Sequence, residues 1–191
     1  MNVLAREPVV PCYVVVDTSG STFADRWIDA TNAMLPLIVQ TLEGDGPPPR
    51  SLCLVSFADT AEVRSYLSDA SSVESLPAFA AGGFSSLASA FCCLADVIGS
   101  DLTQLKADGM IPETPIGVFV LHGLPTDPPD RLLAARATLK EACPGLRSGV
   151  VTPAETDILS LEGLSLGRRS LVNGPIDLAR TVMQLLADLA S

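Results

Sequence analysis

The chain has 191 residues, of which 48% are hydrophobic, and its formal net charge at pH 7 is −10. This length favours one domain with a sizeable core, so we expect a single domain over residues 1–191. The excess of acidic residues argues against a basic face that binds nucleic acid, and no apolar run is long enough to cross a membrane.

The first half of the chain predicts two buried strands, one helix and an edge strand. Val9–Val16 is rich in β-branched residues and predicts a buried central strand. Apolar side chains near helical spacing predict a helix from residue 22 or 23 to residue 42, with a kink or a break at Pro36. Leu52–Phe57 predicts a second buried strand, and the alternation over Val63–Leu67 predicts its hairpin partner at the sheet edge.

The second half continues the alternation of helices and strands. Asp127 is expected to cap a helix that has Pro128 at its first position, and Asn173 lies where the last helix is capped. The expected elements are a helix at 87–102, a strand at 116–121, a helix at 131–142, a strand at 147–152, a helical turn at 157–161 and a helix at 176–189. Such alternation predicts a parallel, doubly wound sheet with right-handed crossovers.

The N-terminus has no basic segment followed by an apolar core, so we expect a cytoplasmic protein without a signal peptide. The five cysteines form no C-x-x-C pair, which predicts neither a zinc site nor a disulfide framework. Buried, reduced thiols are the simplest interpretation of these residues.

Polar side chains occur at three places near the ends of predicted elements, two of them directly after strands and one before a helix. Asp17, Ser19 and Ser21 come directly after the first strand, Ser85 lies before the helix at 87–102, and His122 follows the strand at 116–121. The carboxyl ends of parallel strands meet at one edge of a sheet, where ligands usually bind. Oxygen donors of this kind suit Mg²⁺ or Mn²⁺. Helix capping by the residues after the first strand is the competing structural explanation.

Four segments resemble those of von Willebrand factor A (vWA) domains, in the same order. Asp17 to Ser21 resembles the Asp-x-Ser-x-Ser element, and residues 57–63 resemble the hairpin between the second and third strands. Residues 82–87 resemble the Gly-Gly-Thr-x-Leu loop, and residues 121–127 resemble the Thr-Asp-Gly-x-Pro-Thr-Asp loop. The last two segments are similar to the bacterial TerY-like branch, which occurs with tellurite-resistance systems.

The resemblance implies the family fold, an α/β architecture with a doubly wound, mostly parallel six-stranded sheet. Helices cover both faces of this Rossmann-like sheet, and one edge strand is antiparallel. The resemblance also implies a metal-ion-dependent adhesion site (MIDAS), in which a bound metal reaches a carboxylate of a partner protein. The implied metal ligands are Asp17, Ser19, Ser21, Ser85 and His122. We expect the partner to contact the residues around this site, namely Thr18, Phe84, Ser86, Leu124 and Asp127.

The sequence departs from the family pattern at the metal site. Ser85 stands in the place of a threonine, after an insertion at Phe84, and it keeps the hydroxyl group. His122 stands in the place of the second aspartate, and a neutral imidazole is a poor ligand for Mg²⁺. Two alternatives follow: a site that binds no metal, or a site that favours Mn²⁺, Zn²⁺ or Ni²⁺. The expected cofactor is therefore Mg²⁺ or Mn²⁺, or none.

These features together predict a module that binds another protein and has no catalytic activity. The resemblance implies a bacterial signalling or stress-response system, with a kinase or a phosphatase as the partner. A scaffold with a decayed metal site is the alternative. Phosphotransfer at Asp17 is the enzymatic alternative, but Ser19 occupies the place where dehalogenase-type phosphatases carry the second aspartate. We expect no contact with nucleic acid or with a membrane.

Overall fold

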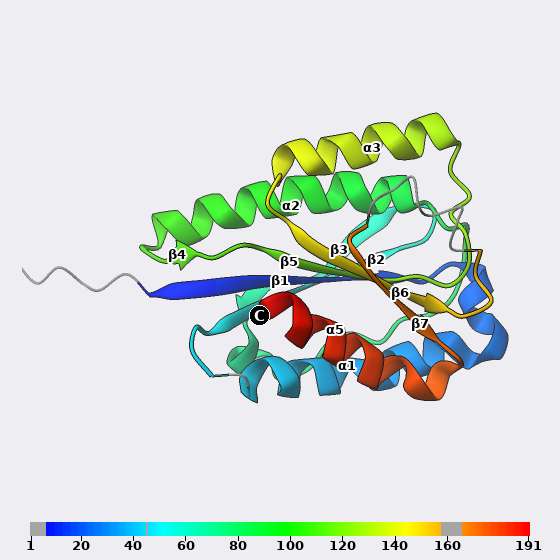
Figure 1. Ribbon diagram of the computed structural model, residues 1–191, viewed down its shortest axis with the longest axis horizontal. Helices are drawn as coiled ribbons and strands as arrows, with labels where there is room; N and C mark the ends of the chain where they lie inside the picture. Colours follow the sequence, from blue (N-terminus) through cyan, green and yellow to red (C-terminus); the bar gives the residue numbers. More distant parts are fainter. Residues whose placement is uncertain (1–6, 45, 158–165) are drawn as a thin grey trace, which may run out of the picture.

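The structure is a computed structural model that describes residues 7–44, 46–157 and 166–191. A seven-stranded sheet forms its centre, with the strand order β3-β2-β1-β5-β6-β7 and the short β4 paired to β1 (Figure 1). The strands are β1 (Pro8–Asp17), β2 (Arg50–Phe57), β3 (Ala61–Asp69), β4 (Ile111–Pro112), β5 (Ile116–Val120), β6 (Arg147–Pro153) and β7 (Arg168–Val172). Among the described strands, only the pair of β2 and β3 is antiparallel. The predicted mixed α/β fold is confirmed, with one strand more than expected.

Helices cover both faces of the sheet and give three layers. The helices and 3-10 turns are η1 (Gly20–Arg26), α1 (Trp27–Gly44), η2 (Ala70–Ser72), α2 (Leu87–Ala107), α3 (Pro129–Ala142), η3 (Pro175–Asp177) and α5 (Leu178–Ala190). In Figure 1, α1 and α5 lie on one face of the sheet, and α2 and α3 lie on the other. Within the described residues, no helix is long and apolar enough to cross a membrane.

The central strand β1 explains why the core has two halves. Val14 and Val16 face the layer of α1 and α5, whereas Tyr13 and Val15 face the layer of α2 and α3. Successive side chains of a strand point to opposite faces, so a strand that is covered on both faces must be apolar throughout. The continuous apolar run of the first strand follows from this position. Because this apolar run ends at Val16, Asp17 lies at the end of a buried strand.

The start of the first helix differs from the prediction. A 3-10 segment, η1, precedes α1, and the interruption lies at Asp25 and Arg26, which have positive φ angles of 54° and 58°. No break occurs at Pro36, through which α1 continues. Pro36 lies on the exposed side of α1. Water can therefore reach the carbonyl group that lacks its backbone donor.

The end of the chain also differs in detail. The last helix, α5, begins at Leu178, and Asp177 rather than Asn173 precedes it. Strand β7 was not predicted, because its Arg-Arg-Ser sequence gives no apolar run. The helical turn predicted at 157–161 lies almost entirely outside the described residues. All five cysteines are free; Cys92 is exposed, whereas buried thiols were expected.

One side-chain amide ties α1 to the segment that leads to the Ser85 loop. Asn32 Nδ2 donates a hydrogen bond to the carbonyl oxygen of Phe79 (2.9 Å), and the Phe79 amide donates one to Asn32 Oδ1 (2.7 Å). We expect Asn32→Ala to lower the free energy of unfolding by about 1–3 kcal/mol, because it leaves two partly buried backbone groups without partners. Chemical denaturation measures this loss. Gln40→Ala, an exposed change on the same helix, is the control, and an equal loss in both variants would contradict the assignment.

Candidate functional site at the carboxyl edge of the sheet

Asp17 is the centre of a polar cluster at the carboxyl edge of the sheet. It ends β1, and its side chain is fully buried. The Ser19 amide donates a hydrogen bond to Asp17 Oδ1 (2.8 Å). Asp17 Oδ2 accepts hydrogen bonds from Ser85 Oγ (3.0 Å) and from the His122 amide (3.3 Å). Three loops that are far apart in the sequence therefore meet at one carboxylate.

The serine hydroxyl groups extend this cluster toward the surface. Ser19 Oγ and Ser21 Oγ lie 3.1 Å apart, within hydrogen-bond distance. Ser21 Oγ donates to the carbonyl oxygen of His122 (3.0 Å). Ser19 and Ser85 are buried, whereas Ser21 is exposed. The cluster of Asp17, Ser19, Ser21 and Ser85, called the Asp17 cluster below, thus runs from the core to the surface.

Backbone hydrogen bonds hold the first two loops together. The Gly20 amide donates to the carbonyl oxygen of Gly83 (2.9 Å), and the Gly82 amide donates to that of Thr18 (2.9 Å). Gly83 has a φ angle of +75°, and a Cβ atom there would lie 2.4 Å from Asp59 Oδ2. Only glycine fits this backbone conformation and this close approach. The Gly-Gly pair in the sequence therefore positions Ser85 beside Asp17.

The Asp17 carboxylate has no positively charged partner among the described residues. Burial raises its pKa, and the hydrogen bonds from Ser19, His122 and Ser85 oppose this shift. Buried carboxylates in proteins are usually paired with a cation or coordinate a metal, because an isolated buried charge is costly. The hydrogen bonds stabilise the ionised form but supply no positive charge. The electrostatics of the cluster therefore favour a cation at this edge.

His122 takes part in the cluster through its backbone rather than its ring. The imidazole lies against the indole of Trp27, with ring centroids 5.2 Å apart, and it forms no ion pair with Asp17. His122 Nδ1 and Trp27 Nε1 are both buried and have no hydrogen-bond partner among the described residues. The hypothesis that the imidazole is a metal ligand stays a prediction. In this conformation the ring fills space between the loop and α1.

Asp127 caps a different helix from the one predicted. Its Oδ1 accepts a hydrogen bond from Ser86 Oγ (2.8 Å), and its Oδ2 accepts one from the Ala88 amide (2.9 Å). Both groups belong to the start of α2, whereas Pro128 precedes α3 and provides no side-chain cap. The prediction that Asp127 caps its own helix is wrong. A carboxylate at an N-terminus satisfies free amide groups and the helix dipole, and here it also joins two loops.

Of the five predicted partner-binding residues, two are buried, two are exposed and Asp127 is half-buried. Thr18 and Ser86 are buried, and Thr18 Oγ1 donates to the Phe57 carbonyl oxygen (3.0 Å). Phe84 and Leu124 are exposed, with relative exposures of 69% and 42%. Phe23, which follows Ser21 closely in sequence, is 79% exposed and was not predicted as a surface residue. An aromatic residue next to the serine motif is the only sequence signal that could have indicated it.

The donors of the Asp17 cluster fit a hard divalent cation. One carboxylate and three hydroxyl groups are available, and Mg²⁺ commonly keeps several waters while taking one or two carboxylates from the protein. The described residues contain no group of three or more His, Cys, Asp or Glu side chains that could hold a metal. A site built from acidic side chains and imidazoles is thus not present in this part of the chain. The Asp17 cluster could therefore hold a cation through oxygen ligands alone, only one of which is negatively charged.

Comparisons with known proteins identify the fold. No protein-family model matches the chain, and no curated protein does. Among solved structures, a von Willebrand factor type A protein from Catenulispora acidiphila has 15% sequence identity and a TM-score of 0.75, covering 96% of this chain and 43% of that one. The SpRpn10 VWA domain has 14% identity and a TM-score of 0.62, covering 94% of this chain and 93% of that domain.

A third structural neighbour has zinc at its own MIDAS motif. Proximal thread matrix protein 1 from the mussel byssus, with a zinc-occupied MIDAS motif, has 14% identity and a TM-score of 0.68. The alignment covers 97% of this chain and 48% of that protein. The chain thus spans about half the length of the first structures it matches. Identities this low show a shared vWA fold and nothing about partners.

Proposed function

We propose that the chain is a protein-binding module that engages its partner through the loops at the carboxyl edge of the sheet. In this proposal a divalent cation at the Asp17 cluster contacts an acidic side chain of the partner. The observation that carries it is the buried Asp17 carboxylate, which has three hydrogen-bond donors but no basic counter-charge among the described residues. The vWA fold supports the same function, because domains with this fold commonly mediate contacts between proteins.

Four residues would hold the cation: Asp17, Ser19, Ser21 and Ser85. The cation would supply the positive charge that a partner carboxylate requires at this acidic edge. Mg²⁺ and Mn²⁺ are the preferred metals, because the donors are oxygen atoms. Zn²⁺ or Ni²⁺ would be favoured if the His122 imidazole turned toward the cluster, since both metals accept nitrogen ligands well.

Exposed apolar side chains surround the cluster and provide contact area. Phe23 lies in η1 after β1, Phe84 lies in the loop before α2, and Leu124 lies in the loop after β5. Exposed aromatic residues of this kind often carry much of the binding energy at interfaces. The net charge of −10 favours a partner with basic groups around its central acidic side chain, since opposite potentials speed association. The TerY-like resemblance supports a cytoplasmic bacterial signalling or stress-response system, with a kinase or phosphatase as the partner.

A metal-free interface is the second candidate function. The hydrogen bonds to both oxygens of Asp17 already order the three loops without a cation. The partner would then contact Phe84 and Leu124 directly. A catalytic role has less support, because the Asp17 cluster contains a single carboxylate and no second acid or base for proton transfer.

Selection of peptides from a random displayed library tests both candidates. The immobilised wild-type chain is screened in Mg²⁺, and the enriched peptides are measured again in a chelator, on Asp17→Asn and on Phe84→Ala. We expect peptides that contain Asp or Glu, whose binding is lost in the chelator and on Asp17→Asn. Phe84→Ala should weaken binding about tenfold or more, as expected for an interface anchor.

The same experiment separates the alternatives. Peptides that bind in the chelator and on Asp17→Asn, but not on Phe84→Ala, would favour the metal-free interface. Peptides that bind all three samples equally would place the binding surface elsewhere, and the carboxyl-edge proposal would fail. Tyr66→Ala, an exposed aromatic change on the edge strand β3, is the matched control for Phe84→Ala.

A further inference from the structure

The backbone and the side chain of His122 have different environments. Its backbone belongs to the site, because the amide donates to Asp17 Oδ2 (3.3 Å) and the carbonyl oxygen accepts from Ser21 Oγ (3.0 Å). The described residues give the imidazole no hydrogen bond, and its buried Nδ1 atom has no partner among them. The ring instead lies against the indole of Trp27, with centroids 5.2 Å apart and an angle of 49° between the planes. Packing, rather than a hydrogen bond from these residues, therefore holds the imidazole.

Trp27 provides a fixed surface for this contact. It is the first residue of α1, it is 1% exposed, and it belongs to the same core cluster as Val16 and Val120. Val16 directly precedes Asp17, and Val120 lies two residues before His122. Figure 1 shows the start of α1 at the end of the sheet where β1 and β5 end. A close-packed core leaves few alternative positions for a side chain as large as an indole.

The position of the imidazole decides which donors the Asp17 cluster offers to a cation. While the ring lies against Trp27, the cluster offers only oxygen donors, which suit Mg²⁺ and Mn²⁺. An imidazole nitrogen would add a ligand that Zn²⁺ and Ni²⁺ accept far better than Mg²⁺ does. Movement of the ring away from Trp27 would open a cavity beside a buried indole, which costs stability. The contact with Trp27 thus opposes ligation by the imidazole.

We propose that Trp27 is a positioning residue that keeps the His122 imidazole off the Asp17 cluster and so biases the site toward Mg²⁺ and Mn²⁺. This inference rests on the proposed function, in which the cluster holds a cation, and adds a determinant of metal preference. His122 is the only histidine of the chain, so no other imidazole can take its place. Removal of the indole should free the ring to become a metal ligand and shift the preference toward Zn²⁺.

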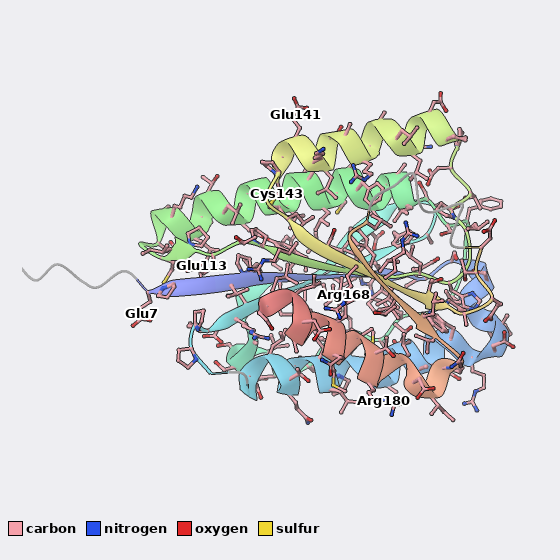
Figure 2. All side chains as sticks on the ribbon, viewed as in Figure 1. Glu7, Glu113, Glu141, Cys143, Arg168 and Arg180 are labelled. Atoms are coloured by element: carbon pink, nitrogen blue, oxygen red, sulfur yellow. The ribbon has the colours of Figure 1, made fainter. Side chains whose placement is uncertain are left out.

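Titration of the ¹⁵N-labelled full chain with Mg²⁺ and with Zn²⁺ tests this role. The amide signals of Ser19 and Ser85 give the dissociation constant of each metal at the cluster. Such residue-specific signals exclude zinc bound to the exposed thiol of Cys92. They also exclude metal at Glu7 and Glu113, which Figure 2 shows at the opposite end of the sheet. The Mg²⁺ constant divided by the Zn²⁺ constant, called the zinc preference below, is the quantity compared.

Three variants separate positioning from a general loosening of the core. Trp27→Leu should raise the zinc preference by about tenfold or more, because the freed imidazole adds a nitrogen ligand. His122→Ala should change the zinc preference of the wild type by less than about twofold, and it should restore the wild-type value in Trp27→Leu. Phe91→Leu is the matched control and should leave the zinc preference unchanged. Phe91 is a fully buried aromatic residue in the other core cluster, where it packs against Phe119.

A measurement on the wild type covers the case in which Trp27→Leu does not fold. The imidazole ¹⁵N signals belong to His122 alone, because the chain has no other histidine. We expect these signals to stay unchanged when Zn²⁺ saturates the shift of the Ser19 amide. Direct ligation of zinc would move the signal of the bound nitrogen strongly.

Three results would overturn the role of Trp27 while leaving a cation at the Asp17 cluster. One is an unchanged zinc preference in Trp27→Leu, and another is a raised preference that His122→Ala does not reverse. The third is a shift of the imidazole signals of the wild type with zinc. If neither metal moved the Ser19 and Ser85 signals of the wild type, the cation of the proposed function would fail, and the role of Trp27 would fail with it.

Discussion

Divalent cations should raise the Tm of this protein, and Asp17→Asn should abolish that rise. A ligand that binds only the folded state adds about 2.7 kcal/mol to the free energy of unfolding at a concentration 100 times its dissociation constant. For a chain of this size, that corresponds to a rise of about 5–10 °C in Tm. Asparagine keeps the shape of the side chain but removes the only negative charge of the cluster. The Tm of the variant should therefore not respond to Mg²⁺ or Mn²⁺.

Asp59→Asn is the matched control for this thermal-shift measurement. Asp59 lies at the same edge of the sheet and accepts a hydrogen bond from the Phe84 amide, but it is not part of the Asp17 cluster. Its variant should keep the full response to metal. An equal response in the wild type and Asp17→Asn would show that the cation binds elsewhere. If the Tm of the wild type did not change with Mg²⁺ or Mn²⁺, the metal-free interface would be favoured.

Asp127→Ala should cause the largest loss of stability among the surface-loop substitutions considered. The carboxylate accepts hydrogen bonds from Ser86 Oγ and from the Ala88 amide at the start of α2. Hydrogen bonds to charged groups contribute about 1.5–3 kcal/mol each, and loss of a helix cap costs about 0.5–2 kcal/mol. Because Asp127 is only half-buried and these effects overlap, we expect the free energy of unfolding to fall by about 2–4 kcal/mol. Chemical denaturation measures the change.

Asp130→Ala provides the comparison for Asp127→Ala. Asp130 is exposed in the first turn of α3, where a carboxylate gains only about 0.3–1 kcal/mol from the helix dipole. A loss in Asp130→Ala as large as that in Asp127→Ala would contradict the assigned cap. Hydrogen exchange adds a second readout, since the first turn of α2 should lose protection in Asp127→Ala while the first turn of α3 keeps it.

The sequence predicts the central strands and the site best where local patterns and burial agree. Val9–Val16 is apolar throughout because the strand is covered on both faces, and the polar residues that follow mark its carboxyl end. The parallel strands β1 and β5 then bring Asp17 and the backbone of His122 together, whereas backbone contacts of Gly82 and Gly83 bring Ser85 to the same edge. The contact between Asp17 and His122 requires only the order of the elements and the direction of the strands, whereas the position of Ser85 also requires the Gly82–Gly83 turn.

Other features depend on contacts that a local pattern does not contain. Asp127 is followed by prolines, which suit the start of α3, yet its carboxylate caps α2, a helix that begins 40 residues earlier in the chain. Strand β7 pairs with β6 over Arg168–Val172 although its sequence is polar, because it lies at the edge of the sheet. The His122 ring lies against the ring of Trp27, and no spacing rule in the sequence connects these two residues.

The most direct test of the central claim is to locate the bound cation with Mn²⁺. Mn²⁺ broadens the NMR signals of nearby nuclei, so a spectrum of backbone amides from the ¹⁵N-labelled, metal-stripped chain reports the position of the ion. The account predicts that the amide signals of Ser19, Ser21, Ser85 and His122 disappear first, and that they persist in Asp17→Asn. Broadening confined to other acidic surfaces, or broadening at the carboxyl edge that Asp17→Asn does not remove, would contradict a cation at the Asp17 cluster.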